Sequence, residues 1–282
     1  MSIAFPDVAP PWFTWSVIVL FGALIGSFLN VCIYRLPREE SIVSPRSRCP
    51  KCRHPIAWYD NIPVLSFIAL RARCRQCRAP IAWQYPLVEL LAIAATVAVV
   101  LRFGVTPAAL VYAVFLYGLL VASFVDLEFQ IIPDEISVGG LAVGFGLSFL
   151  IPALHGTENR WVALGWSAVG VLAGGGTLYL TGLLGDFLFK KESMGGGDIK
   201  LLAMAGSVLG WKAVLITFFI APIFALIPGL FVLAFKKSHI IPYGPFLSIA
   251  LIVSLFAGDA IVRASGMDEA IRLLWEYYGP SG

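Results

Sequence analysis

Long apolar runs separated by short polar segments occupy almost the whole chain. Six of these runs contain no Lys, Arg, Asp or Glu, and a seventh, at 81–100, is interrupted only by Glu89. A helix needs about 20 mostly apolar residues to cross a bilayer, and these runs come close to that length. An eighth run, 201–211, is shorter and follows a glycine-rich turn, which is tolerated where a helix lines protein or a water-filled cavity. The pattern predicts an all-α polytopic membrane protein with about eight transmembrane helices; the six charge-free runs are 8–34, 103–125, 136–154, 161–185, 213–235 and 240–258.

Composition supports this class of protein. Of the 282 residues, 59% are hydrophobic and only 13% are charged, and the mean hydropathy is +0.86. These values exclude a disordered chain, a coiled coil and an ordinary soluble enzyme. The net charge of +3 is too small to indicate a nucleic-acid partner, so none is expected.

The basic residues are unevenly distributed. Ten of the 20 Lys and Arg lie between Arg35 and Arg78, together with only three acidic residues. No Lys or Arg precedes the first apolar run, so this run is not a cleaved signal peptide. The positive-inside rule therefore places the N-terminus outside and the basic segment in the cytoplasm. Eight alternating crossings then place the loops at 126–134, 190–198 and 236–237 in the cytoplasm as well.

Four regions follow from this topology. We expect a first transmembrane helix within residues 1–35, a cytoplasmic insert at 36–80, and a membrane domain of seven helices at 81–262. The tail at 263–282 is amphipathic and aromatic, which favours an interfacial segment; a frayed terminus is the alternative.

The insert contains an internal repeat that carries four of the five cysteines. The pattern CxxCRxPIAW begins at Cys49 and again at Cys74, and it supplies Cys52 and Cys77 as the second members of each pair. Two such turns can bind one Zn²⁺ through four thiolates, and a site closed in this way is structural. The alternatives are a redox pair or two disulfides. A reducing cytoplasm opposes disulfides, and a redox centre needs one CxxC rather than two.

Acidic residues are rare near the predicted membrane, and those at membrane depth are candidates for function. Asp126, Asp134, Asp186 and Asp198 all fall at the predicted cytoplasmic edge. Asp134 follows a proline and opens a helix, so it is interpreted as a helix N-cap. Asp186 is interpreted as a solvated residue at a helix end, and the role of Glu89 is left open.

Asp126 and Asp198 are the strongest candidates for catalytic residues. An acid at a helix C-terminus opposes the helix dipole, and Asp126 gains no cap there. Asp198 follows three glycines, which allow a closer backbone approach than a cap requires. Two carboxylates at one depth can share a proton and hold a water between them, as in aspartic proteases. One would act as a base toward the water while the other polarises the scissile carbonyl.

Several motifs resemble bacterial type IV prepilin peptidases. They include GxGD at Gly195–Asp198, with Lys200 and two leucines after it, and Asp126 ahead of an Ile-Pro-Asp. The paired CxxC insert fits the same family. The N-terminal GSFLNV and YRLP, the YPLVELL at 85–91 and the YGPF at 243–246 also match.

The resemblance implies a bifunctional enzyme in the bacterial inner membrane, with its active site facing the cytoplasm. Such enzymes are membrane aspartyl endopeptidases that remove the basic leader from type IV prepilins and type II secretion pseudopilins. They then methylate the new N-terminus with S-adenosylmethionine. The family's catalytic aspartates match Asp126 and Asp198. The sequence contains no Gly-rich methyl-donor fingerprint, so residues that bind this cofactor are not assigned.

Three alternatives stay open at this stage: a peptidase without methylation, a proton-coupled membrane transporter, and a non-catalytic zinc-bearing assembly protein. A transporter would place its acids near the bilayer midplane and often shows repeated halves. An assembly protein would leave Asp126 and the glycine-rich turn without a role.

Overall fold

The computed structural model describes residues 10–190, 194–235 and 242–266. Within these ranges the regular secondary structure is helical, apart from two isolated β-bridges. The all-α prediction is therefore confirmed for the part of the chain that is described. The long helices are α1 (Pro11–Arg35), α3 (Gln84–Phe103), α4 (Pro107–Phe129), α5 (Asp134–Leu150), α6 (Arg160–Phe189), α7 (Gly196–Phe235) and α8 (Gly244–Ala264), and the short ones are η2 (Leu36–Arg38), η3 (Trp58–Asn61), α2 (Leu65–Ala69) and η4 (Pro152–His155).

Six of the described helices are long and apolar enough to cross a membrane, so the chain is a multi-pass membrane protein. The helix α5 is 17 residues long, which corresponds to about 26 Å. Within α7 the backbone is non-helical at Gly210, with φ 78° and ψ 175°, so two helical segments meet there. The two segments of α7 correspond to the runs predicted at 201–211 and 213–235. The eight predicted segments are thus α1, α3, α4, α5, α6, the two parts of α7, and α8.

The ends of α4 and α6 are defined by local signals. The hydroxyl of Thr106 accepts a 3.1 Å hydrogen bond from the N–H of Ala109, and Pro107 follows it in the first turn of α4; both features favour a helix start. At the other end, Gln130 adopts the left-handed conformation and donates its N–H to the carbonyl of Asp126. This cap ends α4 one turn after Asp126 and so fixes the position of that residue.

Glycines allow two pairs of helices to approach closely. In α1, a Cβ at Gly26 would lie 2.6 Å from the Cα of Glu89 in α3. Between α6 and α7, a Cβ at Gly170 would collide with the carbonyl of Gly206, and one at Gly206 would collide with the carbonyl of Gly170. Small residues at such contacts let backbones pack directly, as is typical of membrane helices.

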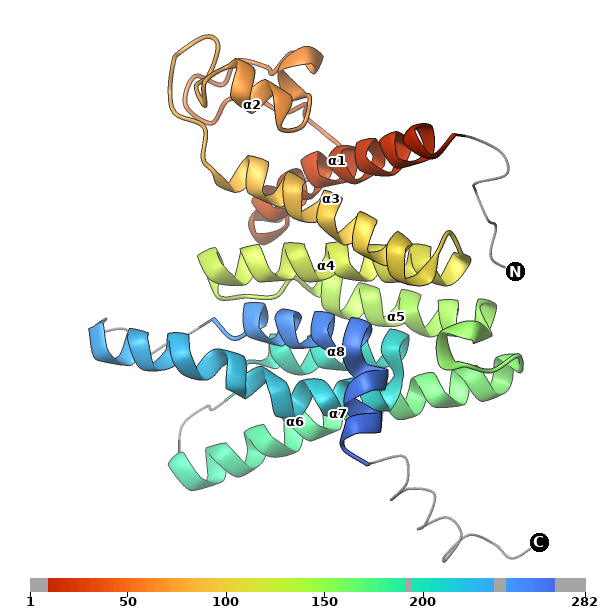
Figure 1. Cartoon of the computed structure of the whole chain (residues 1–282). Helices are drawn as coiled ribbons and strands as arrows, with labels where there is room; N and C mark the ends of the chain where they lie inside the picture. The colour runs from red at the N-terminus through yellow and green to blue at the C-terminus, as the bar shows by residue number, and fades with distance from the viewer. Residues whose placement is uncertain (1–9, 191–193, 236–241, 267–282) are drawn as a thin grey trace, which may run out of the picture.

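The helix α4 is the most buried of the spanning helices and forms the centre of the bundle. Figure 1 shows it between the α1–α3 pair and the group made by α5–α8. Its Leu119, Val121 and Val125 are fully buried, as are Leu202 of α7 and Leu251 of α8. Packing around α4 therefore brings the ends of helices that are far apart in sequence to one end of the bundle.

The insert between α1 and α3 folds into two matching turns, here called the knuckles (residues 48–55 and 73–80). In each knuckle, the first cysteine forms backbone hydrogen bonds with residues that come just after the second cysteine. Arg53 and Arg78, which directly follow the second cysteines, both have φ 58°. The 25-residue sequence repeat is thus also a structural repeat. Figure 1 shows the insert beside the ends of α1 and α3, away from α6 and α7. We call the end of the bundle where α1 stops and α3 begins the insert end.

Candidate active site and cysteine cluster

Asp126 is buried in the last turn of α4, at the insert end of the bundle. Its Oδ2 accepts a 2.8 Å hydrogen bond from the backbone N–H of Gly244, the first residue of α8. A Cβ at Gly244 would lie 2.8 Å from the same oxygen. Glycine at this position therefore leaves room for the carboxylate and presents a donor to it.

Asp198 lies in the first turn of α7, directly after the three glycines. Its N–H donates a 3.1 Å hydrogen bond to the carbonyl of Gly195. A Cβ at Gly197 would lie 3.1 Å from the Cβ of Ile132, which follows α4. The glycine-rich turn thus brings the start of α7 against the segment that follows Asp126, as its composition predicted.

The two aspartates line one cavity of about 310 Å³. The segments Gln130–Ile132 and Gly195–Gly197 form much of its wall. The carboxyl groups of Asp126 and Asp198 are close enough to interact electrostatically. Two carboxylates from helices 72 residues apart in sequence therefore share one polar cavity at the insert end.

Tyr243 lies beside this pair, immediately before α8. Burial, together with the nearby carboxylate of Asp198, raises the pKa of Tyr243 to about 12. Its phenol therefore stays protonated at neutral pH. Tyr243 and Gly244 belong to a motif that the sequence analysis matched without giving it a role, and the Gly-Pro pair at the start of a helix is the only local signal that marks them.

Asp134 and Lys200 form an ion pair at the edge of the same cavity. The Nζ of Lys200 lies 2.7 Å from Oδ1 of Asp134, and both side chains line the cavity while remaining largely exposed. The interpretation of Asp134 as a helix cap is wrong. Pro133 occupies the N-cap position, and the side chain of Asp134 reaches the first turn of α7 instead of its own helix. Asp186 is exposed in the last turn of α6, as expected.

Glu89 has a structural partner in the insert. It is buried in α3, and its Oε2 accepts a 2.7 Å hydrogen bond from the N–H of Val64, next to α2. The same region of α3 is linked to α1, because Asn30 donates a 3.0 Å hydrogen bond to the carbonyl of Tyr85. Glu89 therefore attaches the insert to the membrane helices.

The structure brings the four insert cysteines together. The sulfur atoms of Cys49, Cys52, Cys74 and Cys77 all lie within 4.8 Å of one another. Cys49 and Cys77 come from different knuckles, and their sulfurs are 3.8 Å apart, well beyond the roughly 2.05 Å of a disulfide. A tetrahedral Zn²⁺ with bonds of about 2.3 Å places its sulfurs roughly 3.8 Å apart, so the cluster fits this metal.

At Cys49, the first cysteine of the first knuckle, the backbone favours the thiolate form that metals require. Backbone N–H groups, that of Cys52 foremost, lower the pKa of Cys49 from its usual range to about 7. The fifth cysteine, Cys32, is buried within α1 and lies outside the cluster.

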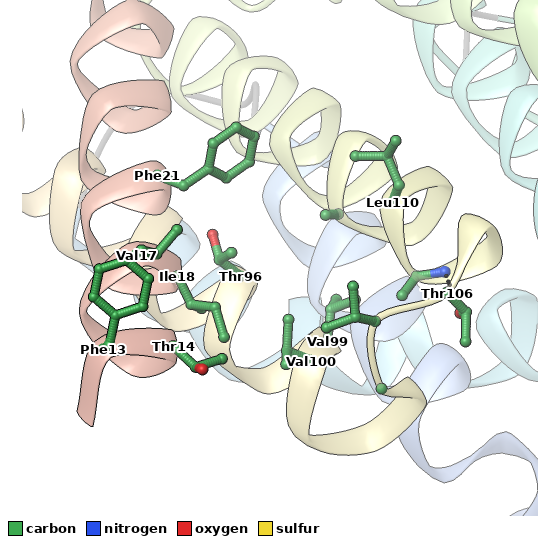
Figure 2. A pocket seen from close by; sticks show the side chains of 14 residues that line it. Phe13, Thr14, Val17, Ile18, Phe21, Thr96, Val99, Val100, Thr106 and Leu110 are labelled. Atoms are coloured by element: carbon green, nitrogen blue, oxygen red, sulfur yellow. Dashed lines mark hydrogen bonds between the residues drawn. The ribbon is translucent and has the colours of Figure 1, made fainter. Parts of the chain in front are cut away.

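A second cavity, of about 330 Å³, lies between α1, α3 and α4 (Figure 2). Phe13 and Phe21 of α1, Val99 of α3 and Leu110 of α4 point toward it. None of the residues that line it is charged. The cavity therefore provides an apolar space but no group for acid–base or metal chemistry.

Comparison with known proteins identifies the relatives of this chain. Residues 20–103 match the family model described as Bacterial Peptidase A24 N-terminal domain, and residues 113–230 match the Type IV leader peptidase family. A protein of Aeromonas salmonicida named "Prepilin leader peptidase/N-methyltransferase" is 36% identical over 283 residues, covering 90% of this chain and 94% of the relative. The chain belongs to the type IV leader peptidase family.

Other members of the type IV leader peptidase family carry the same name. A relative from Pseudomonas aeruginosa is 34% identical, covering 87% of this chain and 91% of its own length. One from Myxococcus xanthus is 42% identical over 211 residues, covering 74% of this chain and 60% of the relative. No solved structure is significantly similar to this chain.

The first match ends with α3, and the second begins at residue 113, within α4. The N-terminal match contains the insert and its four cysteines, and the match to the type IV leader peptidase family contains both Asp126 and Asp198. The cysteine cluster and the aspartate cavity thus fall in separately matched parts of the chain.

Proposed function

We propose that this chain is a membrane aspartyl endopeptidase and N-methyltransferase that processes type IV prepilins and type II secretion pseudopilins. Asp126 and Asp198 are the catalytic residues in this proposal. The observation that carries it is their shared cavity, in a chain related to prepilin leader peptidases over most of its length.

The cavity suits general acid–base cleavage of a peptide bond. One carboxylate takes a proton from a water molecule, whose oxygen attacks the scissile carbonyl carbon. The other carboxyl group, protonated, donates a hydrogen bond to the carbonyl oxygen, and a proton then passes to the leaving amine. The hydrogen bond from Gly244 holds one oxygen of Asp126 and directs the other toward the reacting groups.

The enzyme lies in the bacterial inner membrane with the insert end facing the cytoplasm. The ten Lys and Arg between Arg35 and Arg78 support this orientation, because basic segments stay on the cytoplasmic side of a membrane. A prepilin enters from this side with its apolar helix against lipid and the bundle. Its cleavage site then lies at the interface, near Asp126 and Asp198, where the negative charge of the cavity attracts a basic leader.

The four cysteines hold one Zn²⁺ in a structural role. Four thiolates fill the tetrahedral coordination of zinc and leave no position for water or substrate. The insert has few residues of its own to bury, so metal binding supplies a large part of its folding free energy.

The second activity uses S-adenosylmethionine to methylate the new N-terminus. The names of the relatives, which include N-methyltransferase, support this step. The apolar cavity between α1, α3 and α4 does not suit a charged methyl donor, so no binding residues are assigned. A proton-coupled transporter is less consistent with the structure, because the cavity acids gather at the insert end rather than at mid-membrane.

The test is to incubate the purified chain with a prepilin and follow the mass of the substrate. Loss of the leader in the wild-type protein, and its retention with Asp126→Asn or Asp198→Asn, would support the peptidase. A further gain of one methyl group only when S-adenosylmethionine is present would support the second activity. Leader loss without that gain would favour a peptidase that does not methylate.

A further inference from the structure

The short helix α2 presents an apolar face that no other described part of the chain covers. Leu65 and Ile68 are three residues apart, so they lie on the same side of the helix, and they are 65% and 66% exposed. Trp83 is 76% exposed, and its ring packs against that of Phe67 in α2, with 4.9 Å between centroids. Large exposed side chains grouped in this way indicate a contact with something outside the chain.

The hydrogen bond from Val64 to Glu89 sets the depth of α2. Glu89 is five residues into α3, about 7.5 Å below its start, and its carboxylate accepts the N–H of Val64 at 2.7 Å. The residues exposed on the neighbouring turns of α3 include Leu87, Leu90 and Leu91, as expected of a lipid-facing surface. The beginning of α2 therefore lies at the level where α3 is already apolar.

The backbone at Val64 shows that this attachment is specific. Val64 has φ 60° and ψ −49°, which is an unusual conformation for a β-branched residue. Such a conformation persists where surrounding contacts determine it. Glu89 makes the contact that orients the N–H of Val64, so α2 is held against α3 at a defined height.

Basic residues surround this apolar face along the chain. Eight Lys and Arg lie between residues 46 and 78, and Asp60 is the only acid among them. Asp60 is already paired with Arg75, whose guanidinium lowers the pKa of Asp60. Arg71 and Arg73 follow α2 directly and are exposed. Residues 46–78 of the insert therefore combine apolar side chains at membrane depth with a positive charge that only one acid offsets.

We propose that α2 is an interfacial anchor that seats the insert on a bilayer containing anionic lipid. Leu65, Ile68 and Trp83 enter the boundary between headgroups and acyl chains, where aromatic and aliphatic residues are stable. Arg71 and Arg73 contact the phosphates of anionic headgroups, whose attraction for basic residues near the surface is favourable. The two knuckles are then held at a fixed height above the membrane.

The test is the depth of a tryptophan introduced into the full-length chain in lipid nanodiscs. The tryptophan fluorescence of Ile68→Trp is compared with that of the wild-type chain. Both are placed in nanodiscs of phosphatidylcholine and phosphatidylglycerol, with and without brominated acyl chains. The fluorescence that the new tryptophan adds should be largely quenched by brominated lipid and should resist quenching by aqueous iodide. Val114→Trp, on the exposed side of α4, and Glu158→Trp, in an exposed loop, give the limits for a position buried in lipid and for a solvated position.

The headgroup contact is tested by charge removal. With Ile68→Trp present, quenching by brominated lipid should rise with the phosphatidylglycerol content, and Arg71→Gln with Arg73→Gln should abolish this dependence. The matched control, Arg102→Gln with Arg160→Gln, removes the same charge near other helix ends and should leave the dependence intact. Iodide quenching of Trp at position 68 without quenching by brominated lipid would overturn the anchor. Equal quenching in neutral and anionic nanodiscs would overturn the role of the arginines.

Discussion

The backbone N–H of Gly244 donates its hydrogen to Oδ2 of Asp126 across 2.8 Å, although 118 positions separate the two residues in the chain. The contact joins the start of α8 to the end of α4. The backbone N–H of a glycine thus holds one carboxylate oxygen of a proposed catalytic residue in place.

Gly244→Ala should therefore lower the cleavage rate more than it lowers stability. The new methyl group would lie 2.8 Å from Oδ2, so Asp126 must move, and a displacement of about 1 Å at a reacting group can cost roughly 100-fold in rate. The measurement is kcat for a prepilin at saturating concentration. Gly146→Ala is the matched control, because nothing lies within 4 Å of a Cβ there. Equal rates for the two variants would show that the Gly244 contact does not position Asp126.

Asp126→Asn and Asp198→Asn should each reduce cleavage to nearly the uncatalysed level. Asparagine keeps the size of the side chain but cannot accept the proton from water. Since the two carboxylates act as a unit, the double variant should be little worse than either single variant. Single-turnover cleavage of a prepilin measures this. Methylation of a pre-cleaved pilin, which needs no activated water, should persist in Asp198→Asn and so report that the variant is folded. Near wild-type cleavage by either variant would exclude the aspartyl mechanism.

The ion pair of Lys200 with Asp134 should matter more for cleavage than for stability. Both side chains are largely exposed, and exposed pairs contribute at most about 1 kcal/mol to folding. The pair nevertheless joins the segment after Asp126 to the first turn of α7, which carries Asp198. Lys200→Ala should slow cleavage with little change in Tm. Lys200→Asp combined with Asp134→Lys should recover part of the rate. If the exchanged pair is no better than Lys200→Asp alone, the pair does not align the cavity.

The cysteine cluster should contain one zinc per chain. Serine at Cys49, Cys52, Cys74 or Cys77 should release the metal, whereas Cys32→Ala should retain it. Thiolate ligands must be deprotonated to bind metal. Zinc should therefore be retained at neutral pH and released on acidification, when protons displace the metal from the thiolates. Elemental analysis across a pH series tests both statements, and a purified wild-type chain without zinc at neutral pH would contradict the assignment.

Much of this arrangement could be predicted from the sequence. Apolar runs located the membrane helices, because a bilayer imposes a minimum length on each span. The repeat from Cys49 and from Cys74 predicted a four-cysteine cluster, since matched turns present matched ligands. Asp126 and Asp198 stood out because acids are rare at membrane depth, and the structure places both in one cavity.

Other features could not be predicted in this way. Lipid-facing and core-facing residues are both apolar in a membrane helix, so periodicity does not reveal which helices are neighbours. The partner of Asp134 lies 66 residues away on α7, and a local rule assigned it to its own helix instead. The contacts of Gly244 and Glu89 likewise depend on the packing of helices that are distant in sequence.

The contact between Gly170 and Gly206 has a consequence for genetic screens of this enzyme. Their backbones meet directly, and Gly206 lies eight residues along α7 from Asp198, about 12 Å away. Any larger residue at either position would push α6 and α7 apart and tilt the helix that presents Asp198. A survey of inactive alleles should therefore recover Gly170 and Gly206 alongside the two aspartates, although neither glycine touches a substrate. Inactive alleles at these two glycines would report a loss of helix packing rather than a role in the chemistry.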